Sequence, residues 1–151
     1  MVEAPYNVYV IKQLELVIRP RFIEICATAD MTAPQYTALT VLRRRPGITS
    51  SELARRSFVR AQTMATTLEP LLDGGLIRRE PDPTNARRKL LYITDDGVET
   101  IARLSGPIND LERMITDGFS PEERAQFCNL LRRSRSNLAA AQLPSSTDDG
   151  T

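Results

Sequence analysis

The stretch LIRREPDPTNARRKLLYIT, residues 76–94, decides the fold of this chain. Two strand-like runs, Leu76–Glu80 and Lys89–Thr94, flank the segment Pro81–Asn85, which is rich in turn-forming residues. Strands separated by such a segment pair antiparallel, so this pattern predicts a two-stranded hairpin with a long tip.

Two short helices are predicted directly before this hairpin. Thr49 and Glu52 have the spacing of a capping box, so a helix is expected from Ser50 to about Ser57. After a short break, an apolar stripe predicts a second helix over Ala61–Asp73, and the glycine pair that follows allows the positive φ of a helix end. A helix-turn-helix followed by a basic hairpin is a winged helix.

Further helices are predicted on the N-terminal side. Residues 8–28 carry apolar side chains three and four positions apart, and Pro20 is expected to kink this helix because it removes one backbone hydrogen bond. Thr32 is a candidate N-cap for a helix over Gln35–Arg44.

Two more helices are predicted after the hairpin. The first begins at Thr94 and is bent by Gly106-Pro107, and the second begins at Ser120 and runs to about Gln142. The fold class is therefore mainly α with a small β-wing, a winged helix-turn-helix domain flanked by long helices.

The apolar stripes of the terminal helices are too large for one small domain to cover. We expect a two-fold dimer, and the alternative is an all-helical monomer that buries these stripes internally. The expected divisions are an N-terminal dimerisation helix over 1–30, a DNA-binding lobe over 31–97, C-terminal dimerisation helices over 98–143 and a polar, frayed tail over 144–151.

Composition excludes several classes of protein. The chain has 151 residues, 41% of them hydrophobic and 26% charged, and no apolar run of the roughly 18 residues that a membrane helix needs. No secretory signal is visible, so a cytoplasmic location is expected. The chain has no histidine and no paired-carboxylate motif, glycine-rich phosphate loop or metal-ligand cluster, so neither an enzyme nor a cofactor is expected.

Positive charge is concentrated in the middle of the chain. Residues 43–89 carry a net charge of +6, and the remainder carries −5. Such a distribution favours a polyanion as partner, with an ordinary solvated face as the alternative.

The sequence resembles the MarR family of winged-helix transcriptional regulators over about residues 9–142. The resemblance rests on Leu53-Ala54, Gly75-Leu76-Ile77-Arg78-Arg79, Asp82-Pro83-Thr84-Asn85-Ala86-Arg87-Arg88 and Ile93-Thr94-Asp95-Asp96-Gly97. It implies a dimeric, sequence-specific DNA-binding regulator, a repressor that a small ligand releases from a palindromic operator. The alternative is a winged-helix module that uses the same surface to bind a protein.

Three residues depart from the family pattern. Asn85 stands where relatives carry the aspartate of an Asp-x-Arg element, and Thr66 stands where many carry an arginine. Pro70 interrupts the recognition helix, which is the second helix of the helix-turn-helix, Ala61–Asp73. Asn85 is expected to orient Arg87 through a hydrogen bond without charge pairing.

The DNA-binding residues are expected on two elements. Short polar side chains at the start of the recognition helix suit base edges, with plain helix surface as the alternative for the threonines; these residues are Gln62, Thr63, Thr66 and Thr67. The wing-tip Arg87 suits a narrow minor groove. Phosphate contacts are expected from Arg55, Arg56 and Arg60. Contacts to the flanking DNA backbone, or support of the wing as the alternative, are expected from Arg78, Arg79, Arg88 and Lys89.

The resemblance also implies a small, aromatic or phenolic effector in a crevice beside the DNA-binding lobe. Candidate contacts are Arg19, Arg21 and Tyr36, although Tyr36 also suits the core. A peroxide-sensing branch of the family uses a cysteine near the start of the first helix, whereas Cys26 lies near its end. We therefore interpret Cys26 and Cys128 as buried, inert thiols.

Overall fold

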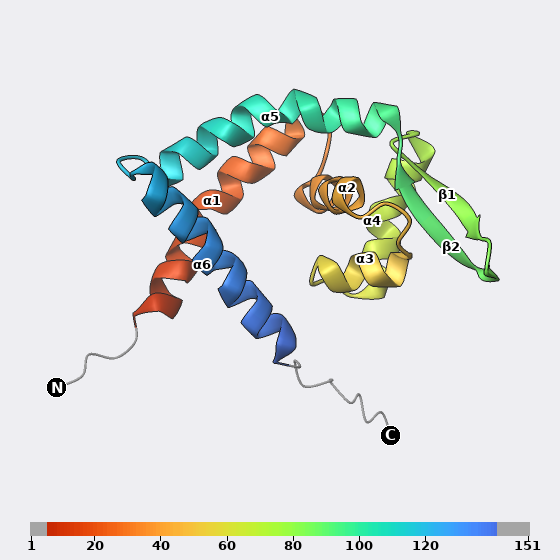
Figure 1. Cartoon of the computed structure of the whole chain (residues 1–151). Helices are drawn as coiled ribbons and strands as arrows, with labels where there is room; N and C mark the ends of the chain where they lie inside the picture. The colour runs from red at the N-terminus through yellow and green to blue at the C-terminus, as the bar shows by residue number, and fades with distance from the viewer. Residues whose placement is uncertain (1–5, 142–151) are drawn as a thin grey trace, which may run out of the picture. The chain divides into compact units, whose positions relative to one another are not determined.

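A computed structural model describes residues 6–141 of the chain. It is mainly helical with one two-stranded antiparallel wing, which confirms the predicted fold class (Figure 1). The elements in order are α1 (Asn7–Ala27), α2 (Ala33–Arg44), α3 (Ser50–Arg56), α4 (Ala61–Asp73), β1 (Ile77–Asp82), β2 (Asn85–Ile93), α5 (Asp95–Ile115) and α6 (Pro121–Ala140). The tail expected to fray, 144–151, lies outside the described residues.

The described residues fall into two compact units, divided after Leu111. The first unit holds one hydrophobic core between α2, α3, α4 and the base of the wing, closed by the end of α1 and the first half of α5. Its fully buried large side chains are Leu39, Leu42, Leu53, Met64, Leu71, Leu91, Leu104 and Cys26. This core fixes the helix-turn-helix to the wing.

Side-chain caps set two of the helix starts as the sequence predicts. Thr32 and Gln35 form a complete capping box at α2, and Ser120 and Glu123 form another at α6. The box predicted at Thr49 is only half made. The Thr49 hydroxyl accepts a bond from the Glu52 N–H at 3.2 Å, but the Glu52 carboxylate pairs with two arginines of the following turn instead of returning to the cap.

The hairpin differs from its prediction at the tip. The strands extend to Asp82 and Asn85, so the turn between them is short, and the long tip predicted over Pro81–Asn85 is wrong. The ladder pairs Asp82 with Asn85 and Pro81 with Lys89, which leaves Ala86–Arg88 bulged out of the ladder on β2. Pro81 has no N–H to donate, which suits a break in the pairing at that point.

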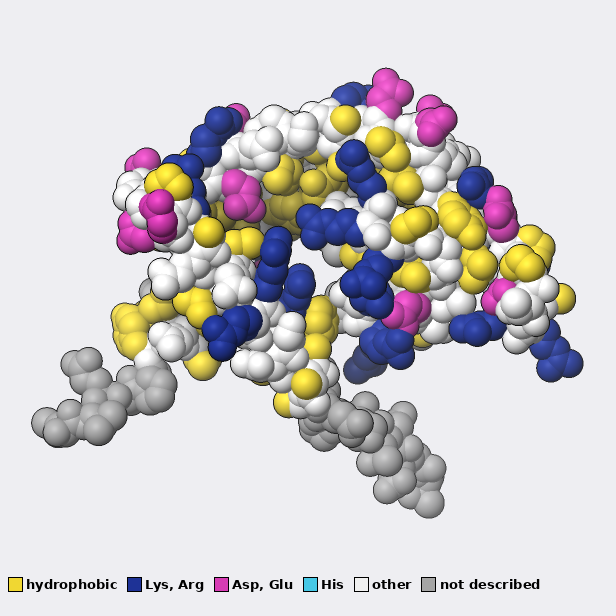
Figure 2. Space-filling view, in the orientation of Figure 1, with side chains coloured by type: hydrophobic (Ala, Val, Ile, Leu, Met, Phe, Trp, Pro, Cys, Tyr) yellow, Lys and Arg dark blue, Asp and Glu magenta, His cyan; other side chains and the backbone are white. Residues whose placement is uncertain are grey.

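The terminal helices expose much of their apolar surface, and hydrophobic side chains are visible on the surface at the first turns of α1 and at the last turns of α6 (Figure 2). On α1, Phe22 and Ile25 pack against the core, whereas Val10, Leu14 and Val17 are exposed. The helix α6 has no buried residue among those described. Cys128 on α6 is consequently exposed, so its interpretation as a buried thiol is wrong, while Cys26 is fully buried. Among residues 6–141, no helix combines the length and apolarity that a membrane crossing requires.

Gly97 allows α5 to start against the base of the wing. An added Cβ there would stand 2.3 Å from the Leu76 carbonyl oxygen and 2.6 Å from Cγ1 of Ile93. Both distances are far below van der Waals contact, and one neighbour is backbone. Only glycine therefore fits at this junction.

Gly97→Ala is expected to destabilise the protein by about 3 kcal/mol, because the backbone must move to admit the methyl group. Urea denaturation measures this change in the free energy of unfolding. Gly106→Ala is the matched control, since it makes the same change in the same helix at a position where an added Cβ would meet nothing within 4 Å beyond the neighbouring backbone of its own helix. Equal midpoints for Gly97→Ala and the parent would contradict the packing described.

Candidate nucleic-acid interface

The helix α4 buries one face and presents the other to solvent. Met64, Leu68 and Leu71 anchor it in the core, and Gly75 ends it with a φ of +72°. The predicted readers Gln62, Thr63 and Thr66 are exposed on it, and Thr67 is partly buried. An anchored helix with a short polar outer face at its N-terminal end is the arrangement that a recognition helix requires.

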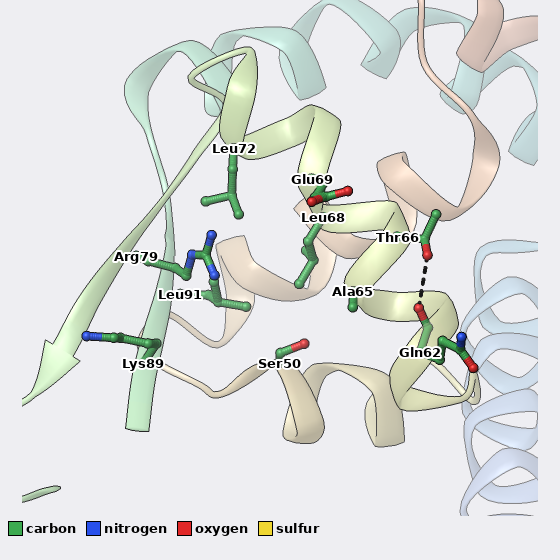
Figure 3. Close-up of a pocket in the computed structure, with 10 residues that line it drawn as sticks. All are labelled: Ser50, Gln62, Ala65, Thr66, Leu68, Glu69, Leu72, Arg79, Lys89 and Leu91. Atoms are coloured by element: carbon green, nitrogen blue, oxygen red, sulfur yellow. Dashed lines mark hydrogen bonds between the residues drawn. The ribbon is translucent and has the colours of Figure 1, made fainter. Parts of the chain in front are cut away.

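A hollow of about 360 Å³ lies between the outer face of α4 and the wing (Figure 3). Leucine side chains from α4 and β2 contribute its apolar surface. Polar and charged side chains reach it from three elements, with Gln62, Thr66 and Glu69 on α4, Arg79 and Lys89 on the wing, and Ser50 at the start of α3. The hollow therefore joins the recognition helix and the wing into one mixed polar and basic surface.

Only two of the four predicted base readers line the hollow. Gln62 and Thr66 line it, whereas Thr63 and Thr67 are not among its lining residues. The Thr66 hydroxyl bonds the Gln62 carbonyl at 3.1 Å, and the Thr67 hydroxyl bonds the Thr63 carbonyl at 2.8 Å. These bonds engage the hydroxyl hydrogens, so each threonine presents a methyl group and an acceptor oxygen.

Sequence reasoning missed Glu69 and Ser50 as members of this surface. Glu69 follows Gln62 and Thr66 at helical spacing, so the period of the helix was the signal that could have found it. Ser50 gives no such signal, since only the tertiary fold brings α3 beside α4 and the wing.

The wing tip is ordered by two local hydrogen-bonded turns. The Asp82 carboxylate accepts bonds from the Thr84 N–H at 2.9 Å and the Thr84 hydroxyl at 2.7 Å, and these bonds hold the pKa of Asp82 below its usual value. Asn85 Oδ1 accepts from the Arg87 N–H at 3.1 Å. Asn85 thus positions the backbone of Arg87 within the bulge, which leaves the guanidinium exposed.

The basic side chains near this surface are not equally available. Arg55 and Arg56 both pair with the Glu52 carboxylate, at 2.8 Å for Arg56. Arg78 pairs with Glu80 and stacks over the Tyr92 ring at 4.6 Å, so it supports the wing. Within residues 6–141, no ion pair engages Arg60, Arg79, Arg87, Arg88 or Lys89, all of which are exposed. These five therefore offer charge to a polyanion at the surface of α4 and the wing, although the charge of Arg88 also acts on the Asp82 carboxylate.

The candidate ligand contacts lie on α1 and α2. Arg19 is exposed and pairs with Glu15, whose hydrogen bond raises the pKa of Arg19. Arg21 is exposed, and Tyr36 packs edge-on against Phe22 with ring centroids 5.6 Å apart. Tyr36 is thus partly buried and packs against the core. Burial raises the pKa of the Cys26 thiol, which disfavours the reactive thiolate, as its interpretation as an inert thiol requires.

Comparison with known proteins settles the family. The family model for MarR matches residues 29–88, the segment from the α1–α2 turn to the wing tip. The transcriptional regulator HosA of Escherichia coli O111:H- is 32% identical over 105 residues, which are 69% of this chain and 77% of HosA. The chain belongs to the MarR family. It is a DNA-binding transcriptional regulator and not an enzyme.

Solved MarR-like structures share the fold across nearly the whole chain. PcaV of Streptomyces coelicolor, solved with its natural ligand, has a TM-score of 0.71 at 24% identity and covers 90% of this chain and 98% of its own. The repressor CouR, solved on a 23-mer DNA duplex, has a TM-score of 0.74 at 23% identity and covers 89% and 99%. At these identities the likeness shows the fold alone.

The bonds at the wing tip of this MarR-family chain lead to a prediction. Asn85→Ala removes the acceptor of the Arg87 N–H, so the amide hydrogen of Arg87 is expected to exchange faster with solvent. Asn85→Asp is the control, because it keeps an acceptor at the same position. Hydrogen exchange followed by NMR measures both, and equal Arg87 protection in Asn85→Ala and the parent would contradict the role given to Asn85.

Proposed function

We propose that this chain acts as a dimeric repressor that binds a palindromic operator and is released by a small ligand. The observation that carries the DNA-binding half is the surface formed by α4 and the wing. This surface combines the polar side chains of the recognition helix with five exposed basic side chains that form no ion pair within residues 6–141. All of them belong to one lobe built around one core. Because an operator lies on the chromosome, we also propose a cytoplasmic location.

Base recognition is assigned to α4. The Gln62 amide has the donor and acceptor pair that matches the N6 and N7 edge of adenine in the major groove. Thr63, Thr66 and Thr67 offer methyl groups for thymine methyls. A wing-tip bulge that presents Arg87 suits the minor groove, where negative potential is concentrated in narrow tracts.

Phosphate contacts are assigned to the basic side chains around these readers. Arg60 precedes α4, and Arg88 and Lys89 follow Arg87 on β2. Arg55 and Arg56 join them if a phosphate takes the place of the Glu52 carboxylate, at the cost of two ion pairs in which the arginines are exposed and Glu52 is partly buried. Phosphate contacts of this kind fix register and make binding sensitive to salt.

Dimerisation is supported by the exposed apolar side chains of the terminal helices. These include Val10, Leu14 and Val17 on α1 and Leu130, Leu131 and Leu138 on α6. Burial of such faces between two copies would remove apolar surface from water and place two recognition helices about a two-fold axis.

Release by a small ligand is supported by the likeness to PcaV, which was solved with its natural ligand. The ligand class proposed is a small aromatic or phenolic compound, with Arg19, Arg21 and Tyr36 as the candidate contacts. Arg19 would have to leave its exposed ion pair with Glu15 in order to bind the ligand. Tyr36 would contact the ligand through the part of its ring that the core does not cover.

The experiment that tests this function is selection from a randomised duplex pool, followed by binding measurements at several salt concentrations. The selected sites are expected to be imperfect palindromes with half-sites about 10 bp apart, and affinity is expected to fall steeply with salt. Insertion of about 5 bp between half-sites turns one groove to the opposite side, so affinity should fall towards the non-specific level. Binding that ignores both spacing and salt, or capture of a protein instead of DNA, would favour the alternative of a protein-binding module.

Single substitutions test the assignment of roles. Gln62→Ala is expected to relax preference at one inner position by about 1–3 kcal/mol, because the bidentate contact is lost. Arg87→Ala is expected to weaken binding and change preference at the outer positions of the site. Arg124→Ala on α6 is the control for lost charge and should leave the selected sequence unchanged. The roles are refuted if Gln62→Ala and Arg87→Ala both select and bind the parent's sites with parent affinity.

A further inference from the structure

Phe58 combines an unfavourable backbone with an exposed ring. It lies in the turn between α3 and α4 with a φ of +57°, and 56% of its surface is exposed. A bulky residue in the left-handed region is an outlier, since its Cβ crowds the neighbouring carbonyl. Exposure of the ring means that the chain gains little burial in exchange.

The same helix-end geometry occurs elsewhere in the chain with residues that suit it. After α4, Gly75 donates its N–H to the carbonyl three residues back, and the next N–H bonds five residues back; Asp30 does the same after α1. Phe58 repeats both bonds after α3, from its own N–H to Arg55 at 3.3 Å and from the Val59 N–H to Ala54 at 3.1 Å. Glycine and aspartate tolerate this conformation, whereas phenylalanine does not.

The position of Phe58 indicates what the ring is for. It stands three residues before Ala61, the first residue of α4, and two before the exposed Arg60. These residues lead into the end of the recognition helix that carries Gln62. Strain that neither folding nor packing explains is retained at functional sites.

We propose that the Phe58 ring contacts an apolar surface of bound duplex DNA where the recognition helix enters the groove. This inference rests on the proposed function. The contact is a thymine C5-methyl group or the face of a deoxyribose, which are the apolar surfaces beside the phosphates that Arg60 would hold. Phe58 is accordingly a further specificity or affinity residue of the DNA-binding surface, separate from the polar readers of α4.

The test compares stability and DNA affinity in the same variants of the full chain. Phe58→Gly removes both the strain and the ring, so its Tm is expected to be at least that of the parent while its affinity for the selected duplexes falls about tenfold. Phe58→Tyr keeps the ring and is expected to retain the parent's affinity. If Phe58 had a purely structural role, Phe58→Gly would not raise or keep the Tm while it lowers the affinity for DNA.

Asp30→Gly is the matched control. It changes a residue with a φ of +55° and the same pair of backbone bonds, in the turn before α2. Its Tm should not fall, and its DNA affinity should equal the parent's, because nothing in the proposal places Asp30 on DNA.

Selected duplexes in which thymine is replaced by uracil distinguish the two DNA surfaces. If the contact is a thymine methyl group, Phe58→Gly lowers affinity on the thymine duplex but not on the uracil duplex, whatever the change to uracil costs at the threonines of α4. If it is a deoxyribose, the loss caused by Phe58→Gly is the same on both duplexes.

Parent affinity in Phe58→Gly would overturn the proposal and leave the proposed function intact. A Tm below the parent's would overturn it too, since the ring would then serve the fold. If the parent itself selects no duplex with salt-sensitive binding, the proposed function fails and this inference fails with it.

Discussion

The attachment of the wing to the segment before α3 is the constraint on which the DNA-binding surface depends. The Leu91 N–H donates to the Ile48 carbonyl and the Leu91 carbonyl accepts from the Gly47 N–H, each at 2.9 Å, while the Leu91 side chain is buried. One residue of β2 thus joins the backbone of the helix-turn-helix to the wing and fills the core beneath α4. This junction therefore helps to set where the wing lies relative to the recognition helix.

Beyond this junction the wing has little core to hold it. Ile77 and Leu91 are buried at its base, whereas both strands are mostly exposed further out. The outer wing therefore depends on its backbone ladder and on the turns made by Asp82 and Asn85. Since the folded pKa of Asp82 is lowered, the carboxylate bonds to Thr84 stabilise the tip above the unfolded pKa and are lost only as pH falls through the lowered folded value. At neutral pH the Asp82 carboxylate is therefore charged and accepts both bonds from Thr84 beside the turn of the wing.

Local signals in the sequence were sufficient for most of the fold. Helix ends are marked by the hydroxyl caps at Thr32 and Ser120 and by the glycine after α4. Each of these ends depends on bonds between near neighbours, so a short stretch of sequence contains both partners of every bond. Apolar periodicity likewise placed α4 at Ala61–Asp73, which the structure confirms.

The sequence did not predict the structure where a side chain has a choice of partners, or where paired strands are exposed on both faces. Glu52 can return to its cap or pair with arginines, and spacing alone does not decide between them. Buried and exposed residues do not alternate along the outer part of the wing. The sequence therefore contains no pattern from which the strand register, or the bulge that carries Arg87, could be predicted. Cys128 was interpreted as buried together with Cys26, yet it lies on α6, which has no buried residue among those described.

Thr94 connects three elements of the DNA-binding lobe through its hydrogen bonds. Its hydroxyl donates to the Gly75 carbonyl at 2.6 Å and accepts from the Gly97 N–H at 3.2 Å, and its own N–H donates to the Leu76 carbonyl at 3.0 Å. The end of α4, the end of β2 and the start of α5 therefore meet at one residue, and Gly97 leaves no slack between them. A shift of the start of α5 would therefore act directly on the end of α4 and the end of β2. Under the proposed function, these bonds are a route by which a ligand that moves α5 would act on the DNA-binding surface.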